Sequence, residues 1–225
     1  MKKQNNILLA QKYIFNKDLG EGNFYAVPNM IGRNVMVVKH DKKTSMLMPH
    51  AIMTKDKKEI SVVVDNNFIK SEQNKKVSGS TVCFKVGRNK CRFEDLEQIV
   101  IELSEFFMDE VCFQGKVFYD LDRSIFKIYI YDVLTYSEYQ NRKGETPYFD
   151  RRFILNMLYQ HHSFKTVEIP IAFYYGNNIL ECDKLYDTME TIYNDLDGYL
   201  IYKENGTYIF GQTTSVLIKF KGDDI

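Results

Sequence analysis

The stretch that decides the fold is LDGYLIYKENGTYIFGQTTSVLIKFK, residues Leu196–Lys221. β-branched and aromatic residues cluster on both sides of its Glu204-Asn205-Gly206 turn. Such clusters around a glycine-containing turn predict strands, here at Tyr199–Lys203, Thr207–Phe210 and Val216–Lys221. The chain therefore closes on β structure.

Three charged residues lie at the ends of these strands. Lys219 and Lys221 are two positions apart, so their ammonium groups project from the same face and can grip one phosphate. Asp197 precedes Gly198 at the start of the first strand, where a carboxylate can hold a metal ion or a ribose. Each pair by itself is common in proteins, and a terminal lysine pair is usually a solvated strand end.

The rest of the chain mixes strands and helices without regular βα alternation, which indicates an α+β fold with antiparallel sheets. The predicted strands are Asn34–Val38, Ile60–Val64 and a hairpin of Val111–Tyr119 with Ser124–Tyr131. Apolar residues at helical spacing predict helices at Phe93–Phe107, Asp150–His161 and Asp183–Leu196. The second helix carries an apolar stripe of Phe153, Ile154, Met157 and Leu158.

The bulk composition excludes several classes of protein. Thirty basic and thirty acidic residues give a net charge of zero, which argues against general coating of a polyanion. The four cysteines form no CxxC pair and have no histidine at zinc spacing, so reduced thiols are expected. The apolar run Ile7–Ala10 is too short for a signal peptide or a membrane span. We therefore expect a cytoplasmic protein with no membrane partner.

The order of the C-terminal motifs resembles the covalent nucleotidyltransferases, the superfamily of mRNA-capping guanylyltransferases and polynucleotide ligases. The likeness is carried by Asp197-Gly198, then Tyr208 and Gly211, then Lys219-Phe220-Lys221. The resemblance implies antiparallel sheets with flanking helices around a nucleotide cleft, in a single domain over residues 1–225. It also implies nucleotide-binding roles for Asp197, Lys219 and Lys221, and a metal-binding role for Asp197.

Two upstream segments fall in the same order. The segment IYIYDVL, Ile128–Leu134, is similar to the strand of the superfamily that packs against the base, which places Tyr131 or Tyr129 near a purine face. The segment PYFDRRFIL, Pro147–Leu155, is similar to one in which an arginine begins a helix. The alternative for the tyrosines is ordinary packing within a sheet.

The nucleophile of this superfamily is a lysine in a Lys-x-Asp-Gly motif near the end of an early strand, and it attacks the α-phosphate of a nucleoside triphosphate. The resemblance assigns this role to Lys39 in VMVVKHDKK, with Asp41 as the matching aspartate. Lys42 stands where the motif has glycine. The alternative is that Lys39 is an exposed lysine at a strand end.

An Asp-Gly-Glu motif of the superfamily precedes the hairpin and contacts the ribose or the metal. The hairpin spacing aligns it with Gln114-Gly115-Lys116, in which both acids are missing. A second register uses Asp109-Glu110 and keeps the acids but lacks the glycine. The first register reproduces the spacing better, and its lysine would weaken binding of Mg²⁺.

The resemblance implies an enzyme that takes GTP or ATP with Mg²⁺ or Mn²⁺ and transfers the nucleotide to an RNA 5′ end. A capping guanylyltransferase is favoured, because the IKFK ending resembles the corresponding strand of capping enzymes. The sequence ends four residues after Lys221, so we expect either that a protein partner supplies the OB-fold domain of those enzymes or that the step needing this domain is dispensable. One alternative is a degenerate scaffold subunit of a viral-type transcription or replication complex. Others are an ATP-dependent ligase-like adenylyltransferase and an unrelated α+β interaction domain.

Overall fold

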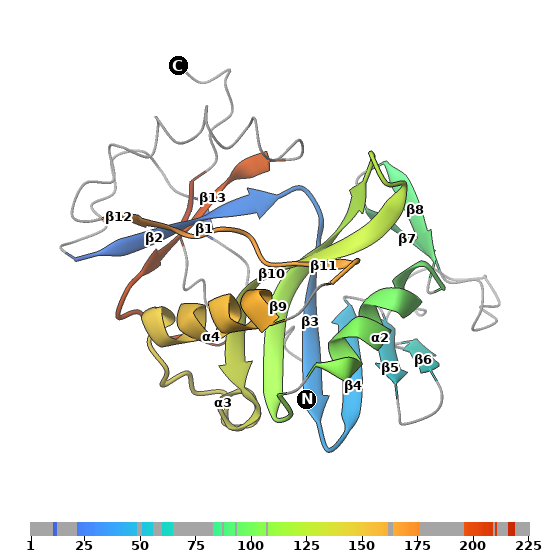
Figure 1. Cartoon of the computed structure of the whole chain (residues 1–225), viewed down its shortest axis with the longest axis horizontal. Coiled ribbons are helices and arrows are strands. Elements are labelled where there is room, and N and C mark those ends of the chain that lie inside the picture. The colour runs from blue at the N-terminus through green and yellow to red at the C-terminus, as the bar shows by residue number, and fades with distance from the viewer. Residues whose placement is uncertain are drawn as a thin grey trace.

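The computed structural model describes residues 11–12, 22–48, 51–55, 60–64, 83–86, 88–92, 94–106, 108–161, 164–175, 196–208, 210 and 216–218. Two main sheets and one small hairpin make up the β structure of these residues (Figure 1). The first sheet, sheet A, has the strand order β1-β14-β13-β2-β12. The second, sheet B, has the order β11-β10-β9-β3-β4-β5-β6, and β7 pairs with β8.

Most neighbouring strands run antiparallel, as the sequence predicts. The strands of sheet A are β1 (Gln11–Lys12), β2 (Phe24–Met30), β12 (Phe173–Tyr175), β13 (Leu196–Lys203) and β14 (Val216–Ile218). Those of sheet B are β3 (Arg33–His40), β4 (Lys43–Met48), β5 (Ala51–Lys55), β6 (Ile60–Val64), β9 (Val111–Asp120), β10 (Ile125–Thr135) and β11 (Val167–Glu168). The hairpin consists of β7 (Cys83–Val86) and β8 (Asn89–Arg92).

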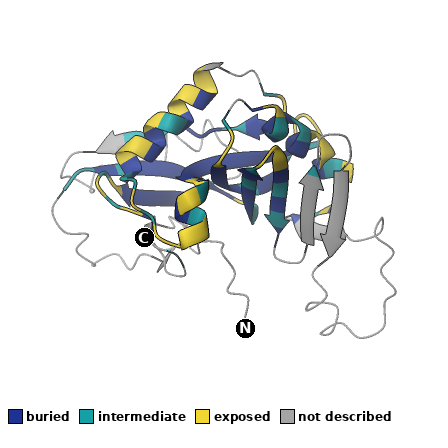
Figure 2. Ribbon diagram, turned by 90° about the horizontal axis from the view of Figure 1, so that it is seen from below, coloured by how far each residue is buried: buried dark blue, intermediate teal, exposed yellow. Residues whose placement is uncertain are grey.

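Helices cover both faces of sheet B (Figure 2). One face packs against a short 3₁₀ helix, η1 (Glu94–Leu96), and against α2 (Glu97–Glu105) and α4 (Tyr148–His161). The opposite face packs against α3 (Tyr136–Asn141) and Tyr208. Burial of these apolar faces supplies the main driving force for folding.

Among the described elements, the chain passes from sheet A to sheet B through the short turn between β2 and β3, and it returns to sheet A between β11 and β12. The turn between β2 and β3 contains Gly32, where a Cβ atom would lie 2.5 Å from the carbonyl oxygen of Val117 in β9. No larger residue fits there without moving the backbone, so the turn packs directly against sheet B. The glycine thereby fixes where the two sheets meet.

A buried ion pair joins α4 to β10. Arg151 Nε donates to Asp132 Oδ1 at 2.8 Å and Arg151 Nη2 donates to Asp132 Oδ2 at 3.2 Å. Arg151 Nη1 also donates to the carbonyl oxygens of Thr146 and Gly206. Arg151, one of the two arginines in the segment Pro147–Leu155, therefore connects α4, β10 and the turn that follows β13.

A second buried acid, Glu138, takes part in the N-terminal cap of α3. Glu138 and Thr135 form a reciprocal capping box, and the other carboxylate oxygen of Glu138 accepts from the backbone N–H groups of Glu145 and Thr146. Burial by itself would raise the pKa of Glu138, but the backbone N–H groups of Thr146, Thr135 and Glu145 outweigh it and lower the pKa to about 2. The carboxylate thus fastens the loop after α3 to the helix.

The hairpin, the strands at Asn34–Val38 and Ile60–Val64, and the first two predicted helices are confirmed, with their ends no more than four residues from the predicted ones. The apolar stripe of α4 is partly wrong, because Phe153 and Met157 are exposed while Leu155 and Leu158 are buried. Leu196 begins β13 rather than ending a helix, and the rest of the predicted helix at 183–195 lies outside the described residues. Thr207 and Tyr208 are not in a strand.

Among the helices of the described ranges, none combines the length and the apolar character that crossing a membrane requires. The longest helix of these ranges, α4, carries Asp150, Arg151 and Arg152 near its start.

Replacing Glu138 with Gln is expected to lower the free energy of unfolding at pH 7 by on the order of 2 kcal/mol. The folded-state pKa lies below the ordinary value of 4.5, so this stabilisation is complete above pH 4.5 and disappears as the pH falls towards 2. Urea unfolding of the wild type and the variant at pH 7, 5 and 3 measures the difference.

Glu145→Gln is the matched control, because Glu145 is exposed and its ion pair with Lys143 is expected to contribute less than about 0.5 kcal/mol. An equal loss of stability from both substitutions, or a loss from Glu138→Gln that does not shrink in acid, would contradict the assigned role of Glu138.

Candidate functional site at the junction of the two sheets

Sheet A meets sheet B beside the turn between β2 and β3. Side chains alternate along a strand, so Asn34 in β3 and Gln114 and Lys116 in β9 lie on the face of sheet B opposite to α2. Lys116 Nζ donates to Asn29 Oδ1 in β2 and, at 3.1 Å, to the carbonyl oxygen of Met30. We call Asn29, Asn34, Gln114, Lys116 and Tyr131 the inter-sheet junction.

Gly115 brings β9 close to β10 at this point. A Cβ atom on Gly115 would lie 2.4 Å from the carbonyl oxygen of Tyr129, so the position requires glycine. The Gln114-Gly115-Lys116 register therefore lies at the junction and has a structural reason for its glycine. Asp109 and Glu110, the alternative register, lie at the other end of β3, where they pair with Lys39 and His40.

Tyr131 lies at a bulge of β10, between Ile130 and Asp132. Its ring is buried against Val27 and Leu200 of sheet A, and its hydroxyl donates to Asn34 Oδ1 at 3.2 Å. Burial raises the pKa of the hydroxyl. Tyr131 is the extra residue of the bulge, and its side chain meets sheet A from the face of sheet B that also carries Tyr129.

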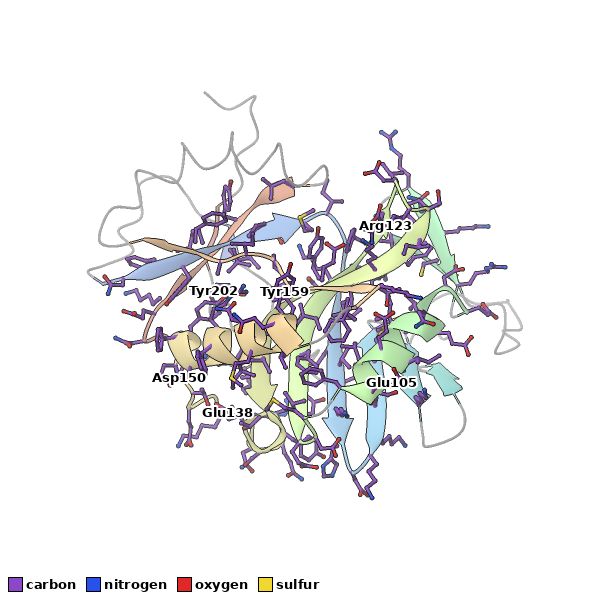
Figure 3. The ribbon with its side chains drawn as sticks, viewed as in Figure 1. Glu105, Arg123, Glu138, Asp150, Tyr159 and Tyr202 are labelled. Atoms are coloured by element: carbon purple, nitrogen blue, oxygen red, sulfur yellow. The ribbon has the colours of Figure 1, made fainter. Side chains whose placement is uncertain are left out.

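Two stacked aromatic pairs flank Tyr131. Tyr148 of α4 stacks on Tyr202 of β13, with ring centroids 4.0 Å apart, and Figure 3 places Tyr202 between that helix and that strand. Phe118 stacks on Tyr129, with ring centroids 4.2 Å apart. Rings at these separations contribute attraction beyond the area they bury. These rings form an aromatic layer beside the polar residues of the junction.

The strand that carries Asp197 runs beside β2 at the same end. Leu196 pairs with Met30, and a register shift separates this pair from Tyr199. Gly198 has φ 103°, a conformation that side-chain-bearing residues rarely adopt, which explains the glycine after Asp197. The Asp197 side chain, Lys219 and Lys221 lie outside the described residues.

Lys39 lies elsewhere, at the far end of β3 and on the opposite face of sheet B. It follows Val35 and Val37, which face α2, and roughly 20 Å of strand separates it from Arg33 at the start of β3. Its side chain is buried, donates to the carbonyl oxygen of Phe106 and lies 3.4 Å from Asp109 Oδ1. The structure therefore does not bring Lys39 to the junction.

Asp41 and Lys42 form the exposed turn between β3 and β4, with φ 48° and 60°. The resemblance to a Lys-x-Asp-Gly motif at this point comes from a hairpin turn, in which such φ values are ordinary. Asp41 is thus separated from Tyr131 and from the Asp197 strand by the length of β3. This geometry gives no support to Lys39 as nucleophile or to Asp41 as a nucleotide ligand.

No protein-family model matches the chain, and no curated protein matches it. Solved structures do match its fold. A structure named Pmar-Lig_Pre has a TM-score of 0.63 at 13% identity, with 96% of this chain and 46% of that one covered. The Chlorella virus DNA ligase-adenylate has a TM-score of 0.53 at 18% identity, and covers 97% and 67%. The ATP-dependent DNA ligase of bacteriophage T7, in complex with ATP, has 0.53 at 10%, with 95% and 68% covered.

The chain has the fold of a ligase nucleotidyltransferase domain. This finding confirms the predicted α+β class and the predicted nucleotidyltransferase-type fold. The chain spans about half the length of the first of these structures and about two-thirds of the other two.

Within this ligase-type fold, Asn29 and Gly32 lie at the junction although the sequence patterns above do not point to them. Asn29-Met30-Ile31-Gly32 has the spacing of Lys-x-Asp-Gly at the end of an early strand, with the glycine kept and the lysine and aspartate replaced. Pro28 lies inside that strand and weakens the strand pattern, because proline cannot donate to a ladder. The spacing of Gly32 from β2 was the signal that could have found the site.

The described residues of the junction do not fit a divalent cation held by the protein. They offer amide groups and the ammonium of Lys116, whereas Mg²⁺ prefers carboxylate oxygens. Across the described ranges, no group of three or more His, Cys, Asp and Glu side chains could hold a metal ion. Asp197 stays a predicted metal ligand, because its side chain is not among the described ones.

A separate pocket of about 630 Å³ lies on the opposite face of sheet B. Lys90, Arg92 and Lys165 line it together with Tyr119, and Asp95 lies 3.5 Å from Arg92. The ion pair removes part of the positive charge, so this pocket is a weaker candidate for a nucleotide than the junction.

If Lys39 is structural, Lys39→Met should lower the free energy of unfolding by about 1–2 kcal/mol, because the buried carbonyl oxygen of Phe106 loses its donor. Nucleotide binding should be unchanged. Lys42→Met, at an exposed turn position, is the control and should stay within about 0.5 kcal/mol of the wild type. Thermal and urea unfolding measure both variants. Unchanged stability together with lost nucleotide binding would return Lys39 to the active site.

Proposed function

We propose that the chain is a nucleotidyltransferase domain of the ligase type, which binds a nucleoside triphosphate at the inter-sheet junction and transfers its nucleotidyl group to a polynucleotide 5′ end. The observation that carries this proposal is the meeting of Lys116, Asn29 and Tyr131 beside the strand that bears Asp197. Cations recognise phosphates, and aromatic rings stack on bases.

Two observations suggest which nucleotides to test. The matching structures include a ligase-adenylate and a ligase with ATP, which makes ATP the first nucleotide to test. The IKFK ending still favours GTP and capping chemistry, so GTP is the second. An RNA 5′ end is the proposed acceptor, and a DNA 5′ end is its ligase-type alternative.

The resemblance also implies an OB-fold domain that closes over the triphosphate. We propose that a partner subunit, or another part of the same protein, supplies it. Lys219 and Lys221 are proposed to hold phosphates, and Asp197 the ribose or a divalent ion.

A second candidate function is a scaffold that keeps the fold without covalent chemistry. The observation in its favour is the composition of the junction. Asn29 occupies the position of the lysine in the Lys-x-Asp-Gly motif, and Lys116 occupies the position of the glutamate in the Asp-Gly-Glu motif. Enclosure of Tyr131 against Val27 and Leu200 also fits a packed interface between the sheets.

Isothermal titration of the folded protein with ATP and with GTP, each with Mg²⁺, tests the proposed function. Tyr131→Leu should weaken binding about tenfold or more, because base stacking on an aromatic ring contributes about 1–3 kcal/mol. Tyr159→Leu, an exposed tyrosine on α4, is the control and should leave the affinity unchanged. Circular dichroism verifies that both variants fold. If neither nucleotide binds to the folded wild type, the junction is no nucleotide site.

A further inference from the structure

The pocket of about 630 Å³ lies on the face of sheet B that packs against α2, away from the inter-sheet junction. Four parts of the chain line it: β8, the segment of η1 and α2, the tip of the β9–β10 hairpin and the residues before β11. Figure 1 shows the β7–β8 hairpin beside that tip. Ligand pockets of proteins have volumes of roughly 300–1,000 Å³, so this one can hold a ligand. We call it the hairpin pocket.

Three cations converge on the hairpin pocket from two separate segments. Lys90 and Arg92 are two positions apart in β8, so their side chains project from the same face. Lys165 joins them from the residues before β11, and all three residues are exposed. Arg123, which Figure 3 labels at the tip of the β9–β10 hairpin, directly precedes a further lining residue, Ser124. Cations grouped in this way recognise phosphate oxygens.

The acids beside these cations already accept hydrogen bonds. Among the described lining residues the acid is Asp95, whose Oδ2 accepts from the backbone N–H of Arg92 at 2.7 Å and whose Oδ1 lies 3.5 Å from Arg92 Nη2. Glu102 of α2 accepts from the backbone N–H groups of Lys165 and Thr166 at 3.1 and 2.9 Å. These bonds fix the segment that carries Lys165, and the described lining keeps more positive than negative charge.

The wall and the buried part of the hairpin pocket suit a base. Tyr119 is half-buried and makes an edge contact with Phe126, with ring centroids 4.9 Å apart and 64° between the planes. Within the part of the chain that the structure describes, the buried Oγ1 of Thr166 finds no hydrogen-bond partner. A buried polar atom left in this way is unfavourable for folding, so the packing of the free chain alone does not explain the hydroxyl.

We propose that the hairpin pocket binds a single-stranded polynucleotide, with the three cations on its phosphates and the ring of Tyr119 against one base. The inference rests on the proposed function for the class of ligand, because that function needs a polynucleotide acceptor. A positive groove with an aromatic ring for stacking is the combination that binds single strands without sequence preference. A single strand is favoured over a duplex, because only unpaired bases can leave the stack and lie on a side chain.

The β9–β10 hairpin carries both this pocket and part of the inter-sheet junction. Tyr119 and Lys116 are three residues apart in β9, so they lie on opposite faces of sheet B and about 10 Å apart along the strand. A strand held in the hairpin pocket would therefore pass the hairpin tip close to the proposed nucleotide site. The pocket would thus add affinity for the acceptor from outside the nucleotide site.

The experiment measures fluorescence anisotropy of a labelled oligouridylate of about ten nucleotides, a length that spans typical single-strand sites, with the folded full chain and no nucleoside triphosphate. Titrations at several NaCl concentrations give the affinity and its dependence on salt. Lys90→Gln/Lys165→Gln should bind about tenfold more weakly or worse at low salt. The slope of log K against log salt should become shallower by about 1.4, because each phosphate contact on a single strand contributes about 0.7.

Two further variants separate the contributions. Lys42→Gln/Lys143→Gln removes the same charge at exposed positions outside the lining and should bind within about twofold of the wild type. Tyr119→Leu should weaken binding about fivefold or more with an unchanged salt slope, because stacking releases no counterions. Circular dichroism verifies that each variant folds.

Titration of the same proteins with ATP and GTP separates this inference from the proposed function. Nucleotide binding at the junction should be unchanged in Lys90→Gln/Lys165→Gln. A wild type that binds nucleotide but no oligouridylate overturns the inference and leaves the proposed function standing. Equal losses in both double variants overturn it too, and so does a loss of nucleotide binding as large as the loss of oligouridylate binding. Oligouridylate binding that depends on the pocket, in a protein that binds neither nucleotide, keeps the inference and removes the proposed function.

Discussion

The ion pair between Arg151 and Asp132 is the contact on which the described architecture depends. Both side chains are excluded from solvent, and two parallel hydrogen bonds join them. Breaking a buried pair by removing one partner leaves an uncompensated charge, at a cost of about 3–5 kcal/mol. Because Arg151 also holds the carbonyl oxygen of Gly206, the pair ties α4 and β10 of sheet B to the segment that leaves β13 of sheet A.

The same pair accounts for the position of the junction. Asp132 follows the bulge of β10, so the requirement that it face Arg151 fixes the register of the strand beyond that point. The extra residue of the bulge is Tyr131, which points at sheet A like Tyr129 two residues earlier, and the alternation changes at Asp132, which pairs with Gln114. The salt bridge of Asp132, the residue after Tyr131, thus helps to hold the strand where the ring of Tyr131 meets Asn34, Val27 and Leu200.

Much of the fold could be predicted from the sequence, because hydrophobic periodicity and turn residues report local structure directly. The β9–β10 hairpin, α4 and β3 are examples, and the order of motifs predicted the superfamily fold. The candidate site was harder to predict, because the position of a side chain depends on which end of the strand and which face of the sheet it occupies. A shift of one residue along the strand moves the side chain to the other face. Lys39 shows this, because the pattern that predicts its strand says nothing about which face is covered by α2.

A different cause explains why the sequence pattern did not predict Asn29 and Gly32 as site residues. Asn29 lies in a strand whose proline obscures the pattern, and its partner Lys116 is distant along the chain. The reason for Gly32 is likewise a contact with the backbone of β9, which no local pattern encodes. Long-range contacts of this kind become visible only when two strands are placed side by side.

The aromatic layer between the sheets has a kinetic consequence. Tyr131, Tyr148 and Tyr202 fill the space with their own rings, so a planar ligand can enter only from conformations in which this packing has opened. The affinity that is observed then equals the intrinsic affinity reduced by the open fraction. When the opening step is rate-limiting, the observed rate of association would become independent of ligand concentration. A domain that moves the two sheets apart would then speed up ligand entry.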